Sequence, residues 1–125
     1  MDDEALDDII DAAIERVIAA LPAPYAERLA SVAIVVEDQP TPEQLESVGA
    51  QGLYGLYQGI PRTRLSADGI AMPSKITIFK WPLVRSSRTP EAFSAAVEAT
   101  VRHEIAHHFG ISDERLRDLE HRPDR

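Results

Sequence analysis

Residues 89–110 read TPEAFSAAVEATVRHEIAHHFG, and this stretch predicts one long helix that carries polar chemistry at its end. Thr89 is a favourable N-cap, and Pro90 is tolerated in a first helical turn, so the helix should begin at Pro90. Gly110 is a natural stop, which places the last helical residue at Phe109. Residues that suit the buried face of this helix are Phe93, Ala96, Val97, Thr100, Val101 and Ile105.

Two histidines near the end of this helix have the spacing of metal ligands. His103 and His107 are four residues apart, and four helical residues turn through about 400°, so both imidazoles leave one face a single turn apart. Two ligands of one tetrahedral zinc ion need this separation. Glu104 lies about 100° further round, where it can reach a water on the metal without binding the metal itself. That is the position of a general base in a zinc peptidase.

A third ligand is expected just after the helix. Gly110 can adopt a positive φ and fold the chain back, and Asp113 then brings a carboxylate three residues later. Asp113 could instead be the N-cap of a following helix, although Ser112 could fill that role. Glu114 and Asp118 are the alternative oxygen ligands.

The other histidines are not expected to bind the metal. His108 points about 100° away from His107 and is expected to pack or to support a ligand, and His121 lies near the end of the chain. A bare H-E-x-x-H sequence occurs by chance in many proteins. Here it lies on a predicted helix with glycine and aspartate at suitable offsets, which favours a metal site.

The preceding residues predict a single α+β domain over 1–125. Apolar residues from Leu6 to Leu21 recur every three or four positions, which predicts a helix that ends before Pro22 and Pro24. Val32–Val36 predicts a buried strand, and Lys75–Lys80 alternates like a half-exposed strand whose lysines indicate a sheet edge. Weaker signals predict a helix at 41–48, a strand at 53–59 whose glycines mark a bulge or a close backbone approach, a loop at 60–74 with a brief strand at 62–65, and a helix at 113–119. Residues 83–88 are ambiguous.

Composition limits the function classes. The net charge is −8, so the chain repels phosphate backbones and nucleic acid is not an expected partner. It has no cysteine, so any metal must be held by His, Asp or Glu. The N-terminus is acidic rather than signal-like, and no apolar run approaches the ~20 residues that cross a bilayer. A cytoplasmic protein without a membrane partner is therefore expected.

With these residues in hand, the chain resembles the zincins, and more closely the bacterial minimal zincin-like metallopeptidases. The likeness rests on 53–61, on 76–80, and above all on 103–113, whose H-E-x-x-H-x-x-G-x-x-D pattern is similar to that of snapalysin-type proteases. The resemblance implies a long N-terminal helix, a small mixed sheet of three or four strands, an active-site helix and a short C-terminal helix. It also implies one Zn²⁺ ion bound by His103, His107 and Asp113. The methionine turn of metzincins is missing in its usual order, because Met1 and Met72 both precede the site.

The first functional hypothesis is a zinc-dependent peptidase that hydrolyses peptide bonds with a metal-activated water and Glu104 as general base. The strand 75–80 is expected to hold an extended peptide or unfolded polypeptide, with Tyr54, Tyr57, Ile76 and Ile78 as candidate substrate-binding residues. Tyr54, Tyr57 or Arg64 could stabilise the oxyanion. The alternative is a metal-poor or inactive zincin scaffold that binds a peptide or partner protein. A third reading, a structural domain with coincidental histidines, does not account for the aligned glutamate, glycine and aspartate.

Overall fold

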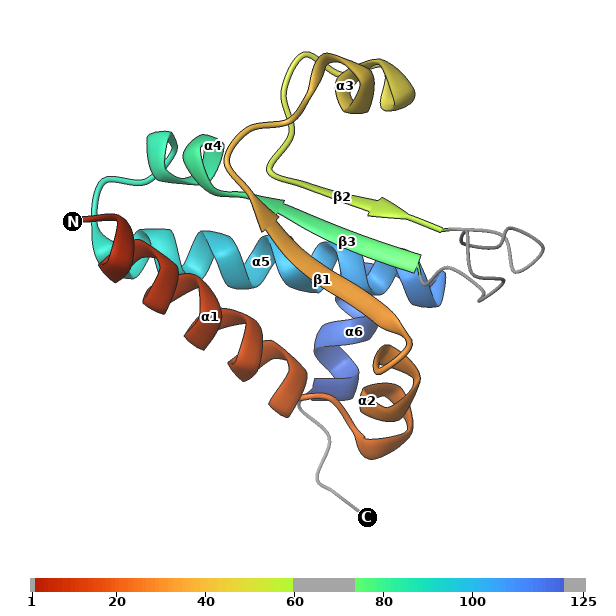
Figure 1. Cartoon of the computed structure of the whole chain (residues 1–125). Coiled ribbons are helices and arrows are strands. Elements are labelled where there is room, and N and C mark those ends of the chain that lie inside the picture. The colour runs from red at the N-terminus through yellow and green to blue at the C-terminus, as the bar shows by residue number, and fades with distance from the viewer. Residues whose placement is uncertain (1, 60–73, 121–125) are drawn as a thin grey trace, which may run out of the picture.

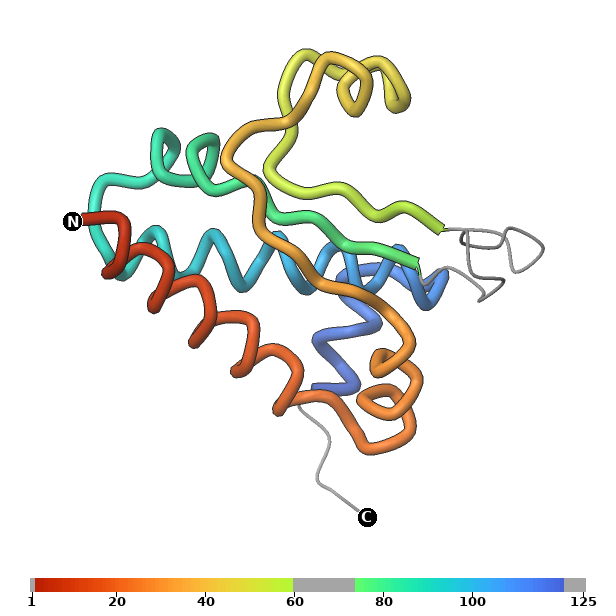
Figure 2. Tube along the Cα trace, in the orientation of Figure 1, coloured from red at the N-terminus to blue at the C-terminus, as the bar shows by residue number. Residues whose placement is uncertain are grey.

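The long helix 90–109 lies against a small mixed sheet in the computed structural model, which describes residues 2–59 and 74–120 (Figure 1). The chain trace in Figure 2 follows the same path. In chain order the elements are α1 (Asp3–Ala19), α2 (Ala23–Leu29), β1 (Val32–Glu37), α3 (Pro42–Val48), β2 (Gly55–Gln58), β3 (Ser74–Phe79), α4 (Lys80–Arg85), α5 (Pro90–Phe109) and α6 (Asp113–Glu120). The expected α+β architecture is confirmed, with a long N-terminal helix, a small mixed sheet and a short C-terminal helix.

The sheet has the order β1-β3-β2, so β3 is its central strand. β3 runs parallel to β1 and antiparallel to β2. The prediction that 75–80 is an edge strand is therefore wrong. Its two lysines make ion pairs instead of guarding an edge: Lys75 Nζ lies 3.9 Å from Glu37, and Lys80 Nζ lies 2.9 Å from Asp7 of α1. Within the described residues, β2 and β1 are the edges.

The core lies between the sheet and the two long helices. The apolar stripe of α1 buries Leu6, Ile10, Ala13 and Val17. These residues join one cluster with Ile76 and Ile78 of β3 and with Phe93, Val97, Val101 and Ile105 of α5. Figure 1 shows α1 beside α5 on the same side of the sheet. α5 is thereby fixed along most of its length, which makes it a rigid support for the histidines at its end.

Local signals set the helix ends as predicted. Thr89 Oγ1 accepts a hydrogen bond from the Ala92 backbone N–H at 3.0 Å, and α5 begins at Pro90. Gly110 ends α5 with φ 68° in the left-handed region. The predicted helix after Thr41 is α3, which begins with a capping box between Thr41 and Gln44.

Two helices depart from the sequence interpretation. Pro22 and Pro24 do end α1, but Pro24 also occupies the first turn of α2, a position that proline favours. α4 begins at Lys80, the last residue of the predicted strand 75–80, and ends at Arg85, within the stretch 83–88 that the sequence left ambiguous. The brief strand expected at 62–65 lies outside the described residues. None of the described helices is both long and apolar enough to cross a membrane.

Candidate metal centre

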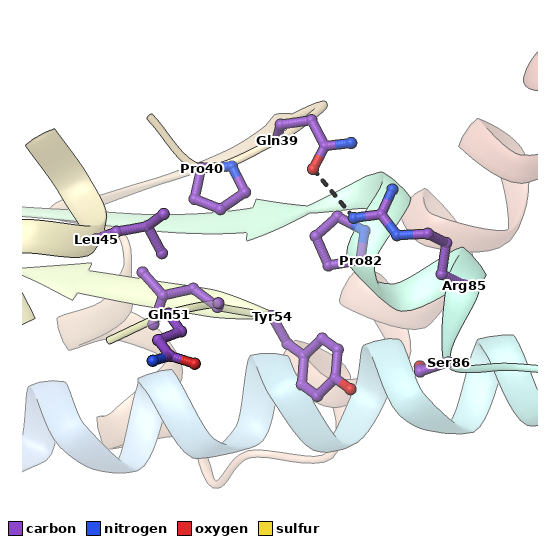
Figure 3. A pocket seen from close by; sticks show the side chains of 10 residues that line it. Gln39, Pro40, Leu45, Gln51, Tyr54, Pro82, Arg85 and Ser86 are labelled. Carbon is purple, nitrogen blue, oxygen red and sulfur yellow. Dashed lines mark hydrogen bonds between the residues drawn. The ribbon is translucent and has the colours of Figure 1, made fainter. Parts of the chain in front are cut away.

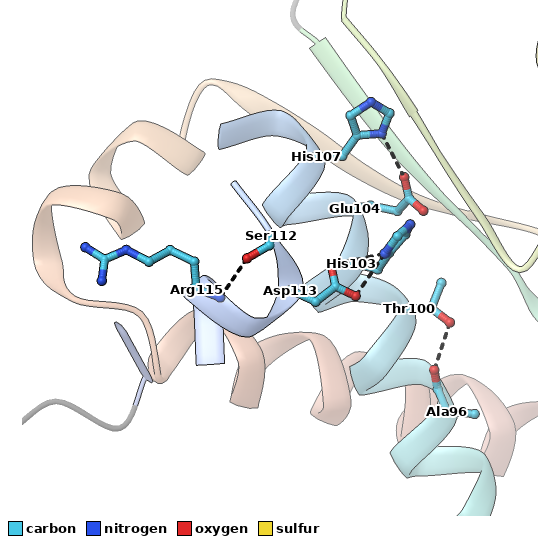
Figure 4. Close-up of polar contacts among 8 residues, drawn as sticks. All are labelled: Ala96, Thr100, His103, Glu104, His107, Ser112, Asp113 and Arg115. Atoms are coloured by element: carbon cyan, nitrogen blue, oxygen red, sulfur yellow. Dashed lines mark hydrogen bonds and ion pairs between the residues drawn. The ribbon is translucent and has the colours of Figure 1, made fainter. Parts of the chain in front are cut away.

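The turn at Gly110 brings the start of α6 back against the end of α5. His103 Nδ1 lies 3.0 and 3.1 Å from the two carboxylate oxygens of Asp113 (Figure 4). Ser112 Oγ accepts a hydrogen bond from the Arg115 backbone N–H at 3.0 Å, so Ser112 caps α6. Asp113 is therefore not needed as the cap, and its carboxylate is committed to His103. This contact raises the pKa of His103 above its ordinary value.

The two histidines of the motif are both open to solvent. The side chain of His103 is 62% exposed and that of His107 is 65% exposed. His107 Nδ1 lies 3.9 Å from Glu104, and its ring centroid lies 5.2 Å from that of Tyr57 in β2. Both rings stand at the end of α5, one on each of two successive turns, as the spacing predicts.

Glu104 is buried between these exposed histidines, with its side chain 8% exposed. Burial raises the pKa of its carboxyl, while the two histidines and a hydrogen bond from the Tyr57 backbone act in the opposite direction. The effect of burial is the larger one, so Glu104 binds protons more readily than a carboxylate in water. This is the property that a proton acceptor and donor near neutral pH requires.

Gly55 allows β2 to lie directly on α5 at this point. A Cβ atom on Gly55 would stand 2.7 Å from Thr100 Cγ2 and 3.2 Å from Glu104 Cγ. The close backbone approach predicted for the glycines of 53–59 is confirmed at this residue. Sequence reasoning did not name Gly55 as part of the site, although a glycine inside a strand was the available signal.

Tyr57 connects β2 with the end of α5. Its hydroxyl lies 3.0 Å from His108 Nδ1, and the two ring centroids are 5.3 Å apart. His108 also packs on Phe109, and burial lowers its pKa. His108 thus takes the packing role expected of it, and its contact with Tyr57 is one that the sequence did not indicate.

The remaining expected residues are not gathered at this site. Ile76 and Ile78 have no exposed surface and belong to the core, so the expectation that they bind substrate is wrong. Residues two apart in a strand share one face, and the face of β3 that carries Ile76 and Ile78 packs on α1 and α5. Tyr54 is 51% exposed at the start of β2. Glu114 and Asp118 are exposed on α6.

The donors fit zinc in kind, because two imidazoles and a carboxylate are its usual nitrogen and oxygen ligands. As the side chains stand, no three His, Asp or Glu residues in the described part of the chain are grouped closely enough to hold a metal ion. Asp113 contacts His103, whereas His107 turns to Glu104 and Tyr57. All three donors are more than two-fifths exposed, so their side chains are free to change rotamer.

An α+β domain with an H-E-x-x-H helix under a mixed sheet defines the class of metallopeptidase scaffolds. The comparison with protein families supports this: the model of the zincin-like metallopeptidases matches residues 29–122. The chain belongs to the zincin-like metallopeptidase family. The comparison with curated proteins gave no match.

Proposed function

We propose that this protein is a zinc-dependent peptidase in which His103, His107 and Asp113 hold the metal and Glu104 transfers the proton. The observation that carries the proposal is the position of Glu104. Its carboxylate is buried against the strand β2 and flanked by two exposed histidines. When bound, a zinc ion supplies Lewis acidity and lowers the pKa of water.

Glu104 is suited to accept the proton of an attacking water and to deliver it to the leaving amine. Its raised pKa brings the carboxyl closer to neutral pH, where one group can both accept and return a proton. The backbone of Tyr57 hydrogen-bonds the carboxylate and fixes its orientation. Gly55 keeps β2 close enough for this contact.

A peptide substrate is held along the edge of β2 that no described strand covers, in place of the strand 75–80 that the sequence suggested. The Phe79 N–H donates to the Tyr54 carbonyl at 2.9 Å, so the polar backbone groups of Tyr54, Leu56 and Gln58 face β3. Alternate residues of an antiparallel strand face opposite edges, so those of Gly55 and Tyr57 face the open edge. An extended peptide added there passes next to Glu104.

Tyr57 is the best placed of the residues considered for stabilising an oxyanion. Its ring packs beside His107 and its hydroxyl lies on His108, which sets the phenol next to the candidate centre. Tyr54 is directed to a different hollow, and Arg64 lies outside the described residues. A hydroxyl that donates to developing negative charge is a common means of transition-state stabilisation.

The experiment is a metal analysis of the protein purified without chelator, combined with hydrolysis of a peptide library. Bound zinc near one equivalent and chelator-sensitive cleavage are expected. Glu104→Gln should keep the zinc and lose the cleavage, with Glu91→Gln, exposed in the first turn of α5, as the matched control. A Glu104→Gln variant with full activity would exclude this mechanism.

The second candidate is a metal-poor zincin scaffold that binds a peptide or partner protein. It is favoured by one observation: Asp113 pairs with His103, and no donor trio is assembled in the described residues. If His103→Ala changed neither the metal content nor any activity, while peptide binding survived, this second function would replace the first.

A further inference from the structure

A hollow of about 580 Å³ lies beyond the start of β2, between the segment 39–54 and α4 (Figure 3). Pro40, Leu45 and Tyr54 line it from the segment, and Pro82 and Arg85 line it from α4. Its volume is in the range of sites that take a small ligand or a side chain. Its lining combines apolar surface with a few polar groups.

Arg85 is the only charged residue among the described residues that line this hollow. Its guanidinium donates to the neutral side-chain oxygen of Gln39 at 3.2 Å (Figure 3). Arg85 is exposed, and within the described parts of the chain it makes no ion pair with a carboxylate, although the protein carries a net charge of −8. A guanidinium has five N–H donors, and a planar carboxylate matches two of them. The guanidinium N–H groups that do not bind Gln39 are therefore available to a carboxylate in this hollow.

The hollow lies beyond the N-terminal end of β2. Tyr54 lines it and is followed directly by Gly55, whose backbone lies against Glu104. A peptide that pairs antiparallel with this edge runs from Gln58 towards Tyr54, so its carboxyl end points into the hollow. The hollow therefore lies on the carboxyl side of the peptide bond that passes next to Glu104.

We infer that Arg85 binds a carboxylate of the substrate on the carboxyl side of the cleaved bond. The inference rests on the proposed peptidase function and names its substrate class. The carboxylate comes either from the free C-terminus of a peptide or from an Asp or Glu side chain near that end. In the first case the protein removes short C-terminal fragments, and in the second it cleaves before acidic positions.

The test uses three peptides that are labelled at the N-terminus and share one sequence, taken from the library peptide that Glu104→Gln protein binds most tightly. One ends in a free carboxylate, one in an amide, and one in an amide with Asp as its third residue from the end. Binding is measured by fluorescence anisotropy in Glu104→Gln protein, which does not consume the probe, with and without Arg85→Gln. Hydrolysis is measured in the corresponding proteins that keep Glu104. Arg88→Gln is the matched control, because Arg88 is exposed just after α4 and does not line the hollow.

Arg85→Gln is expected to weaken binding of the carboxylate peptide about tenfold, as for one charge-assisted contact. KM should rise by a similar factor while kcat stays within about twofold, and the amide peptide and Arg88→Gln should show no such change. A response of the Asp peptide as well identifies the side-chain source; a response of the free acid alone identifies the C-terminus. If Arg85→Gln binds and cleaves all three peptides as the parent protein does, the inference is wrong even though cleavage continues. Arg85-dependent binding without any cleavage would reject the peptidase function and keep the carboxylate site.

Discussion

Gly55→Ala tests whether the close contact of β2 with α5 holds Glu104 in place. The new methyl group would stand 2.7 Å from Thr100 Cγ2, 3.2 Å from Glu104 Cγ and 3.3 Å from the Thr77 carbonyl oxygen. The first distance is far below the 3.5–4.0 Å of a normal contact, so one group must move by about 1 Å.

Any movement of a neighbouring group breaks a hydrogen bond or loosens the pairing of two strands. Thr100 Oγ1 donates to the Ala96 carbonyl at 2.8 Å, and rotating the side chain to withdraw its methyl group breaks that bond. Moving β2 away instead loosens its pairing with β3. Overpacking of this kind costs about 1–3 kcal/mol of folding free energy. A displacement of about 1 Å at Glu104 should also lower kcat/KM about a hundredfold.

Urea unfolding and peptide hydrolysis of Gly55→Ala give the two readouts. Gly52→Ala is the matched control, because no atom lies within 4 Å of its new methyl group, and its stability should change by less than about 0.5 kcal/mol. Thr100→Ser removes the atom at 2.7 Å, so adding it to Gly55→Ala should restore most of the lost stability. The steric argument is refuted if Gly55→Ala unfolds like Gly52→Ala, or if the double variant is no more stable than the single one.

Three further predictions concern charged groups. Glu104→Gln should lower the rate of hydrolysis about 10²–10⁴-fold, as measured by steady-state kinetics. By urea unfolding the variant should be at least as stable as the parent near pH 7, because the raised pKa of Glu104 means that its ionisation destabilises the fold as pH rises. The hydrogen bond to Asp7 raises the pKa of Lys80 in the folded protein. The stabilisation that this charged lysine gives to the fold is therefore complete below pH 10.5 and is lost as pH rises through its higher pKa in the folded protein. Lys80→Met should therefore cost about 1 kcal/mol at pH 8 and less at pH 11.5 by urea unfolding. Asp113→Asn should weaken zinc binding at least about tenfold in a competition titration with a chelator.

The sequence predicts the helices well because their signals are local. The ends of α5 depend on Thr89, Pro90 and Gly110, which act on the backbone within one turn. The order of strands does not follow from such signals. Lys80 forms an ion pair with Asp7, which lies 73 residues away in the chain, and a contact at this separation is not visible in the local pattern that suggested an exposed edge strand. The pattern of β3 was thus recognised, and its place in the sheet was not.

The same distinction applies to the site. His103 and Asp113 are ten residues apart across one glycine turn, and their proximity was predictable. The contact of Tyr57 with His108 spans 51 residues and exists only because β2 pairs with β3 and lies on α5. The burial of Glu104 has the same origin. Motif spacing therefore predicts which groups are present, while the sheet determines their environment.

The contact between Asp113 and His103 bears directly on the metal. An imidazole has two nitrogens, and Asp113 occupies Nδ1 of His103, so only Nε2 remains for a metal while this contact lasts. In that arrangement Asp113 orients a ligand, and its removal should cost about 10–100-fold in affinity. If Asp113 instead turns to bind zinc itself, His103 loses this partner and the loss on Asp113→Asn should be larger, because a protein ligand disappears. The size of the loss thus separates a carboxylate that supports a two-histidine site from one that completes a three-ligand site.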